Sequence, residues 1–240
     1  MTARYAPLVL LVALVAAPAA LAQTDDAPTT AELEALYWQR QEAARQRFTD
    51  ADVAFMTGMI GHHAQALIMS ALAVPNGAGP GVQRLAARID NAQRDEIESM
   101  QRWLRDRGQP VPEVHIEGTR LMVHTPGAAP MDHGQMDHGQ MSHGQMAHGD
   151  HAMMPGMLSQ AQLDELAAAR GATFDRLFLT YMIGHHAGAV TMVDDLFTVD
   201  GAAQDEAAFK LASDVQVDQR TEIARMQRML DAMADDGTAP

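Results

Sequence analysis

Cysteine is absent from this chain of 240 residues. In an oxidising compartment its absence excludes disulfides and thiolate metal ligands, which leaves methionine and histidine to supply soft or borderline donors. Positive charge is also scarce, because 17 Lys and Arg stand against 31 Asp and Glu, and the formal net charge is −14. Such a polyanion is a poor candidate for binding nucleic acid and a reasonable one for attracting cations.

Signatures of catalysis are missing as well. The sequence contains no nucleophile, base and acid set, no phosphate-binding loop and no nucleotide fingerprint, so we expect no enzyme. It does contain 18 Met and 11 His. Generic filling of a hydrophobic core is an alternative explanation for so much methionine.

The N-terminal residues have the pattern of a secretory signal peptide, which we place at residues 1–22. Arg4 supplies a positive charge, residues 8–17 form an apolar run, and residues 20–22 form an A-x-A cleavage signal. The run is too short to span a bilayer, so we expect no stable membrane anchor. We expect export across the inner membrane to the periplasm.

Most of the remaining chain has helical periodicity, and no strand signal competes with it. Capping boxes that begin at Thr29, Thr49 and Ser159 mark three helix starts. The spacing of apolar residues predicts helices at about residues 30–48, 50–74, 81–107, 159–171, 173–197 and 202–234.

Two of the predicted helices carry the same motif. Offsets of three, four and seven residues share one face of a helix, so each motif forms a single stripe of apolar residues, methionine and histidine. The first stripe is Phe55, Met59, His62, Ala66 and Met69, and the second is Phe178, Met182, His185, Ala189 and Met192.

The helix that follows each motif is repeated too. The two stripes are Ile89, Gln93, Glu96, Met100 and Trp103, and Val215, Gln219, Glu222, Met226 and Met229. The repeat is therefore a helical hairpin, and two such hairpins most simply pack as an all-α four-helix bundle. We expect one domain from hairpins at residues 30–108 and 159–235, each with a leading helix, joined by a linker at residues 109–158.

Soft donors would meet inside this bundle. We expect Met59, His62 and Met69 to face Glu96 and Met100 within the first hairpin. The equivalent second set is Met182, His185, Met192, Glu222 and Met226. Thioether sulfur combined with imidazole favours Cu(I) and the chemically similar Ag(I) over hard ions.

The second histidine of each doublet, His63 or His186, lies about 100° further round the helix, so only one of each pair is expected to point to the centre. The alternative is that each histidine is a core residue hydrogen-bonded to the facing glutamate and each methionine is packing. The chain would then be a helical structural or interaction protein.

The linker repeats a pentapeptide four times with Met and His in step. A flexible chain of this kind can wrap low-coordinate monovalent ions without a preformed cage. An inert low-complexity tether is one alternative, and zinc or nickel bound by the histidines alone is another. The candidate ligands are Met131, His133, Met136, His138, Met141, His143, Met146, His148, His151, Met153 and Met154.

Two further features bear on the bundle. A di-iron redox site, which four-helix bundles often carry, needs Glu-x-x-His motifs, but Met59 and Met182 stand where those glutamates would be. Glycines inside the predicted helices each cost about 1 kcal/mol relative to alanine. For Gly58 and Gly188, which have no glycine counterpart in the other copy, close approach and simple tolerance remain equal explanations.

The duplicated motif, with Gln-x-x-Glu-Ile-x-x-Met following each copy, resembles the domain of unknown function family 305. The resemblance covers about residues 52–104 and 175–230. It implies a ferritin-like four-helix bundle of exported bacterial proteins, some of which bind copper in copper tolerance. It further implies metal-site roles for Met59, His62, His63, Met69, Met100, Met182, His185, His186, Met192 and Met226.

The chain departs from a plain family member in its linker, whose units resemble the His-x-x-Met motifs of exported silver- and copper-buffering proteins. It also departs at Asp194 and Asp195, where the first copy has Ala71 and Leu72. We therefore expect an exported protein that buffers or sequesters copper for metal homeostasis and copper resistance, with Cu(I) preferred and silver as a second ion. A copper-transfer protein is its expected partner.

Overall fold

A computed structural model describes residues 28–45, 47–127 and 154–236. The predicted signal peptide and the pentapeptide repeats lie outside these ranges. The elements in chain order are α1 (Thr30–Arg45), α2 (Asp50–Ala71), α3 (Pro80–Asp106), β1 (Glu113–Glu117), β2 (Arg120–His124), α4 (Gln160–Ala168), α5 (Gly171–Thr198) and α6 (Glu206–Asp236). All six predicted helices are confirmed, with ends shifted by a few residues.

The three predicted capping boxes are present. The Thr49 hydroxyl accepts from the backbone N–H of Asp52, whose carboxylate accepts from the Thr49 N–H. Ser159 and Gln162 make the same reciprocal pair at the start of α4. These bonds satisfy N–H groups that a helix start would otherwise leave without partners.

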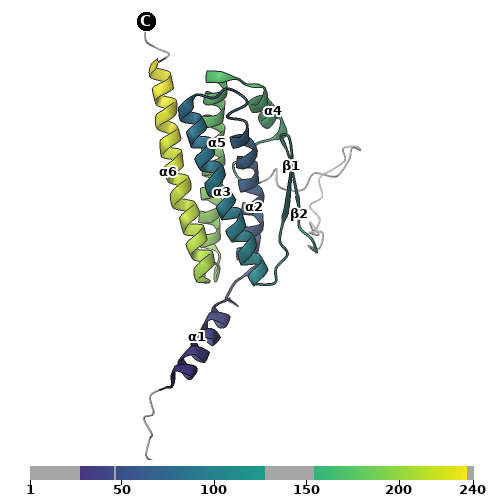
Figure 1. Cartoon of the computed structure of the whole chain (residues 1–240), viewed down its shortest axis with the longest axis vertical. Coiled ribbons are helices and arrows are strands. Elements are labelled where there is room, and N and C mark those ends of the chain that lie inside the picture. Colours follow the sequence, from purple (N-terminus) through teal and green to yellow (C-terminus); the bar gives the residue numbers. More distant parts are fainter. Residues whose placement is uncertain (1–27, 46, 128–153, 237–240) are drawn as a thin grey trace, which may run out of the picture. The chain divides into compact units, whose positions relative to one another are not determined.

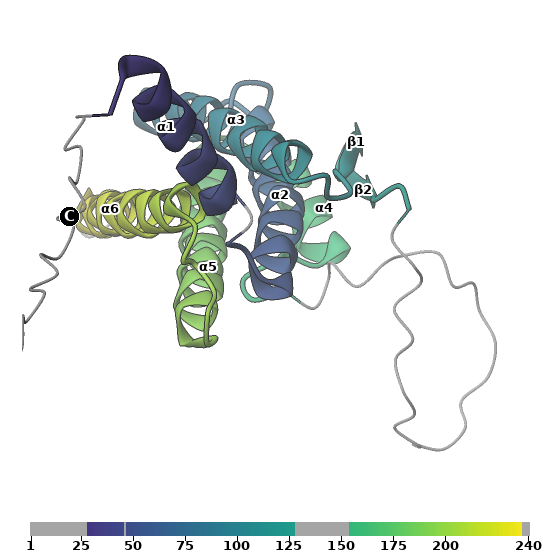
Figure 2. The same cartoon turned by 90° about the horizontal axis from the view of Figure 1, so that it is seen from below.

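The four long helices form the predicted four-helix bundle (Figures 1 and 2). α2 and α3 make one hairpin, α5 and α6 make the other, and the hairpins meet through α2 against α5 and α3 against α6. One core cluster contains Met59 and Val193, and the other contains Met69 and Met182. The early part of α2 therefore packs with the late part of α5, so these two helices run antiparallel.

A β-hairpin at the start of the predicted linker corrects the expectation that the chain has no strands. β1 pairs antiparallel with β2, with Glu113 opposite His124 and Glu117 opposite Arg120. Gly118 is the first of the two loop residues and has φ of +62°, where a type II′ turn takes glycine. A single short hairpin gives a weak sequence signal, which the Pro and Gly content of the linker concealed.

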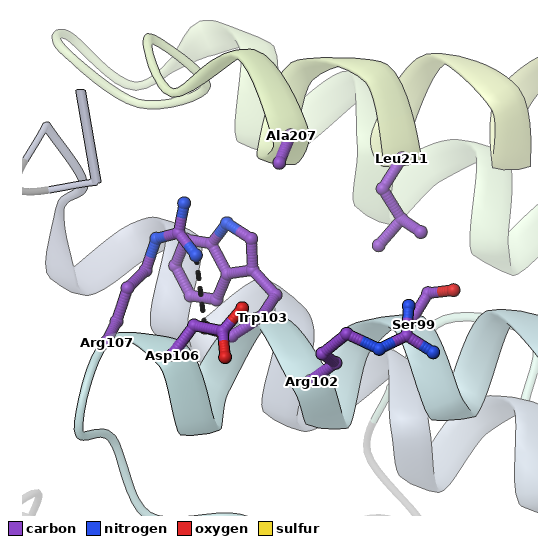
Figure 3. A pocket seen from close by; sticks show the side chains of 7 residues that line it. All are labelled: Ser99, Arg102, Trp103, Asp106, Arg107, Ala207 and Leu211. Carbon is purple, nitrogen blue, oxygen red and sulfur yellow. Dashed lines mark hydrogen bonds between the residues drawn. The ribbon is translucent and has the colours of Figure 1, made fainter. Parts of the chain in front are cut away.

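The end of α3 is tied to the start of α6 by one carboxylate. Asp205 accepts from the Trp103 indole N–H at 3.1 Å, from the Arg107 guanidinium, and from the backbone N–H of Ala208 at 2.9 Å. The guanidinium lies over the indole, 4.2 Å from the ring centroid (Figure 3). A hollow of about 180 Å³ beside these residues has no thioether or imidazole in its lining.

α1 belongs largely to a separate unit, residues 1–39, and is described by itself. Its capping box is formed by Thr29 and Glu32, and the side chains of residues 30–43, including Tyr37 and Trp38, are exposed. None of the described helices has the length and apolarity needed to cross a membrane.

Candidate metal centre

Four histidines form a layer in the middle of the bundle. His62 and His63 come from α2, His185 and His186 come from α5, and all four are fully buried. The His62 and His185 rings face each other across the helix pair, with centroids 3.9 Å apart. One histidine of each doublet therefore lies in the centre, as expected. The expectation that His62 and His185 face the glutamates of their own hairpins is wrong, because His63 and His186 occupy those places.

The second histidine of each doublet contacts a glutamate. His63 Nε2 lies 2.7 Å from Glu96 on α3, and His186 Nε2 lies 2.8 Å from Glu222 on α6. An ionised carboxylate only accepts hydrogen bonds, so each Nε2 carries the proton, and in the neutral ring Nδ1 keeps its lone pair. Metal-binding histidines are commonly oriented by a carboxylate in this way.

The first histidines have different partners. His62 Nε2 donates to the backbone oxygen of Pro155 at 3.0 Å, which again leaves the lone pair on Nδ1. Neither ring nitrogen of His185 has a hydrogen-bond partner among the described residues, and the Nδ1 atoms of His62, His63 and His186 have none either. Buried polar atoms are rarely left unpaired, because each costs about 1–3 kcal/mol.

Burial keeps the central rings neutral. Desolvation lowers the pKa of His62 from its ordinary 6.5 to about 3, with further lowering by the nearby His63 and His186. Desolvation likewise holds the pKa of His185 well below its ordinary value, with the other three rings adding to the effect. Desolvation also lowers the pKa of His186, and the hydrogen bond that this ring makes to the Glu222 carboxylate opposes the shift. Neutral imidazole is the form that binds metal.

Buried thioethers lie on both sides of the histidine layer. Met59, Met69, Met100, Met182 and Met226 are fully buried, and Met192 is partly buried. One core cluster holds Met59 and Met100 with Met192 packed against it, and the other holds Met69, Met182 and Met226.

The expected grouping within each hairpin is therefore only partly right. Met59 and Met100 do share a cluster, as do Met182 and Met226. Because α2 and α5 are antiparallel, however, Met69 of the first hairpin packs with Met182 and Met226 of the second. Met192 of the second hairpin packs with Met59 and Met100 of the first.

The imidazole and thioether donors lie near one another, but the histidine and carboxylate side chains are not positioned to bind one ion together. Among the described residues no group of three or more His, Asp or Glu side chains has the arrangement needed to hold a metal ion. Rotation of a ring or of a flexible methionine side chain would be needed to bring donors onto one ion. Gln93 and Gln219, in the same stripes as the two glutamates, also have buried side-chain atoms without hydrogen-bond partners among the described residues, and the sequence motifs indicated no role for them.

A short stretch before α4 packs against the histidine layer, and we call residues 154–158 the crossing segment. Besides the Pro155 contact, the Gln65 amide donates to the Leu158 carbonyl at 3.0 Å and accepts from the Leu158 N–H at 2.7 Å. A Cβ on Gly188 would lie 2.0 Å from the Pro155 oxygen, so that glycine admits the segment. The glycine without a counterpart in the other copy was the signal for this contact.

Only the last of the predicted linker ligands lies in the described part of the chain. Met154 is partly buried, and its sulfur would lie 3.3 Å from a Cβ on Gly58. The remaining linker candidates, from Met131 to Met153, lie outside the described residues.

The arrangement defines a class: a four-helix bundle from a duplicated hairpin, with an imidazole layer between two thioether clusters. The chain belongs to the family described as "Domain of unknown function (DUF305)", whose model matches residues 52–230. This match confirms the family that the sequence motifs indicated.

Solved structures of the family resemble this chain. A DUF305 fragment from Deinococcus radiodurans is 28% identical, with a TM-score of 0.56 over 77% of this chain and 98% of that chain. A putative secreted DUF305 protein from Streptomyces coelicolor is 22% identical, with a TM-score of 0.57 over 77% of this chain and 94% of that one. CopM in a Cu(II)-bound form is 26% identical, with a TM-score of 0.49 over 75% and 96% of the two chains. The comparison with curated proteins found no match.

Proposed function

We propose that this protein is exported and that it buffers or sequesters Cu(I), with Ag(I) as a second ion, using the bundle centre and the Met/His-rich linker. One observation carries the proposal for the bundle. His62 donates Nε2–H to the Pro155 oxygen, His63 and His186 each place Nε2 against a glutamate, and among the described residues the Nδ1 atoms of these three buried rings have no hydrogen-bond partner. Buried ring nitrogens without partners cost free energy, which binding of an ion would recover.

The neighbouring donors select the ion. Thioethers lie on both sides of the histidine layer, and imidazole with thioether is a soft set that suits Cu(I) and Ag(I). A monovalent ion also costs less to desolvate than a divalent one, and the Glu96 and Glu222 carboxylates behind the rings balance its charge. The proposed bundle ligands are Met59, His62, His63, Met69, Met100, Met182, His185, His186, Met192 and Met226, with Glu96 and Glu222 orienting the second histidines.

The hydrogen-bonded core alternative accounts for part of this geometry. It explains His63 and His186, whose Nε2 atoms contact glutamates. It explains His185 less well, because neither buried ring nitrogen makes a geometrically sound hydrogen bond among the described residues, and only the His62 backbone lies near enough to raise the pKa of His185 slightly. A core position whose only role is packing would favour leucine or phenylalanine, because buried nitrogens without hydrogen bonds lower the stability of the fold.

The linker and the cellular role extend the proposal. In this proposal the Met/His pentapeptides bind several copper ions. The signal-peptide pattern at the N-terminal end directs export to the periplasm. Sequestration there would support copper resistance and transfer to a partner protein. A redox enzyme is the competing function, and an absence of oxidase activity in the copper-loaded protein would exclude it.

Removing the linker repeats tests the bundle site. A variant that lacks residues 128–153 should still bind Cu(I) tightly in competition with a chromophoric Cu(I) chelator, and Zn(II) should not displace the copper. In the same background, His62→Leu with His185→Leu should abolish that tight binding, whereas Gln216→Leu on the exposed side of α6 should not. A deletion variant that fails to compete for Cu(I) would refute the bundle site and leave the linker alone.

A further inference from the structure

The crossing segment brings one linker methionine, Met154, to one of the two thioether clusters. A Cβ placed on Gly58 would lie 3.3 Å from the Met154 sulfur and 3.4 Å from the Met192 methyl carbon. The end of the linker and the late part of α5 therefore meet over a single backbone position of α2. Both methionine side chains are flexible enough to turn their sulfurs toward a shared ion.

The duplicated motif provides an internal comparison for this contact. Met69 is the counterpart of Met192, and it is fully buried, whereas Met192 is partly buried. Tyr181 is the counterpart of Gly58, and its hydroxyl hydrogen-bonds Glu165. Within the described residues, the glycine at position 58 and the neighbouring thioether of Met154 therefore distinguish one end of the bundle from the other.

The segment that carries Met154 is held firmly in place. Pro155 accepts from His62, and Leu158 is bonded through both backbone groups to Gln65. Gly156 packs against the backbone of α5, where its own Cβ would lie 2.6 Å from the Gly184 oxygen. Met154 thus stands at a fixed point, directly after the Met/His-rich repeats in the chain and next to a ligand candidate of the bundle.

The geometry points to a two-thioether site for Cu(I) or Ag(I), formed by Met154 and Met192 over Gly58, where ions pass between the linker and the buried centre. Monovalent copper and silver accept two soft donors, so this pair suffices without a cage. Partial exposure of both side chains gives an ion access that the fully buried methionines lack. The inference rests on the proposed function, because it assigns the exchange point of the same soft-ion protein.

Methionine methyl NMR during a titration of the full chain with Ag(I) tests the pair. In protein with ¹³C-labelled methionine methyl groups, the Met154 and Met192 signals should shift together with one midpoint. Met157, which lies in the same segment and is partly buried, should not shift in that step. Single replacements by leucine assign the signals.

Variants give the quantitative test. Met154→Leu and Met192→Leu should each weaken Ag(I) binding at the remaining methyl by roughly tenfold or more, because loss of even an outer partner of a ligand costs about 10–100-fold. The double variant should lose little beyond either single one, as expected for two donors to one ion. Gly58→Ala should weaken the same step without removing a donor, and since alanine favours the helix it should not lower the melting temperature.

The outcomes separate this inference from the proposed function. If the Met59 and Met100 methyls respond to Ag(I) while Met154 and Met192 stay still or titrate independently, the exchange site is refuted and the bundle site stands. If no methionine responds and the chain takes up no Ag(I), both are refuted.

Discussion

The His62 and His185 rings meet at the centre of the bundle, with centroids 3.9 Å apart and planes tilted by 40°, although the two residues belong to different hairpins. One ring is held by a backbone carbonyl, and the other has no hydrogen bond among the described residues. Because both imidazoles are buried, the stability of the metal-free protein should depend on a pH that leaves them neutral.

Replacing the two histidines of the α5 doublet should have opposite consequences for the metal-free protein. His185→Leu removes two unpaired nitrogens, so stability should stay within about 1 kcal/mol of the parent or rise. His186→Leu leaves the buried Glu222 carboxylate without its closest partner and should cost about 2 kcal/mol or more. Urea unfolding in the presence of a chelator measures both. A larger loss for His185→Leu would show that this ring acts mainly as packing.

Acid should destabilise the metal-free protein well above the range in which carboxylates titrate. Burial lowers the pKa of His62 to about 3 and holds the pKa values of His185 and His186 below the ordinary 6.5. Below pH 6.5 these histidines therefore bind protons in the unfolded chain but not in the folded chain. The free energy of unfolding is therefore highest above that pH. It decreases as the pH falls, by about 1.4 kcal/mol per pH unit for each such ring.

Unfolding free energies measured between about pH 7 and 5 test this slope. Bound Cu(I) should oppose the loss, and His185→Leu should make the slope shallower by about one proton. Equal stability across that range would contradict the neutral buried layer.

Two glycines of α5 should respond in opposite directions to alanine. At Gly188 the new Cβ would meet backbone atoms of Pro155 and Gly156 at 2.0–2.7 Å, so Gly188→Ala should cost about 1–3 kcal/mol or expel the crossing segment. At Gly184 a Cβ meets no described residue within 4 Å, so Gly184→Ala should gain up to about 1 kcal/mol of helix propensity. Thermal unfolding of the matched pair measures the difference, and equal effects would place the segment elsewhere.

Gln65 should hold the crossing segment by its amide. Gln65→Leu leaves the N–H and carbonyl of Leu158 buried without partners, which should cost about 2–4 kcal/mol. Hydrogen exchange at the Leu158 amide should speed up more than exchange in the middle of α3. Gln162→Leu at the exposed start of α4 is a control, and it should lose only a capping interaction of about 1 kcal/mol. Unchanged protection of Leu158 would contradict the clamp.

Local patterns in the sequence predicted the helices and where they begin and end. The capping boxes at Thr49 and Ser159 and the stripe through Met59, His62 and Met69 all depend on residues three to seven apart, which a helix brings together whatever surrounds it. The duplicated hairpin and the family followed from the same motifs. The β-hairpin was missed because ten strand residues beside several prolines give little periodic signal.

The contacts between the two hairpins could not be predicted from such local patterns. The sequence alone determined that imidazoles and thioethers line the inner faces of four helices, because helical periodicity fixes which side chains share a face. Only the tertiary structure decided that α2 and α5 run antiparallel, so that Met69 and Met192 pack with the opposite hairpin, and that Pro155 comes to His62. Such contacts depend on helix direction and on the path of a connecting segment. Residues so far apart in the chain leave little local pattern, and the unmatched Gly188 indicated a close approach without identifying its partner.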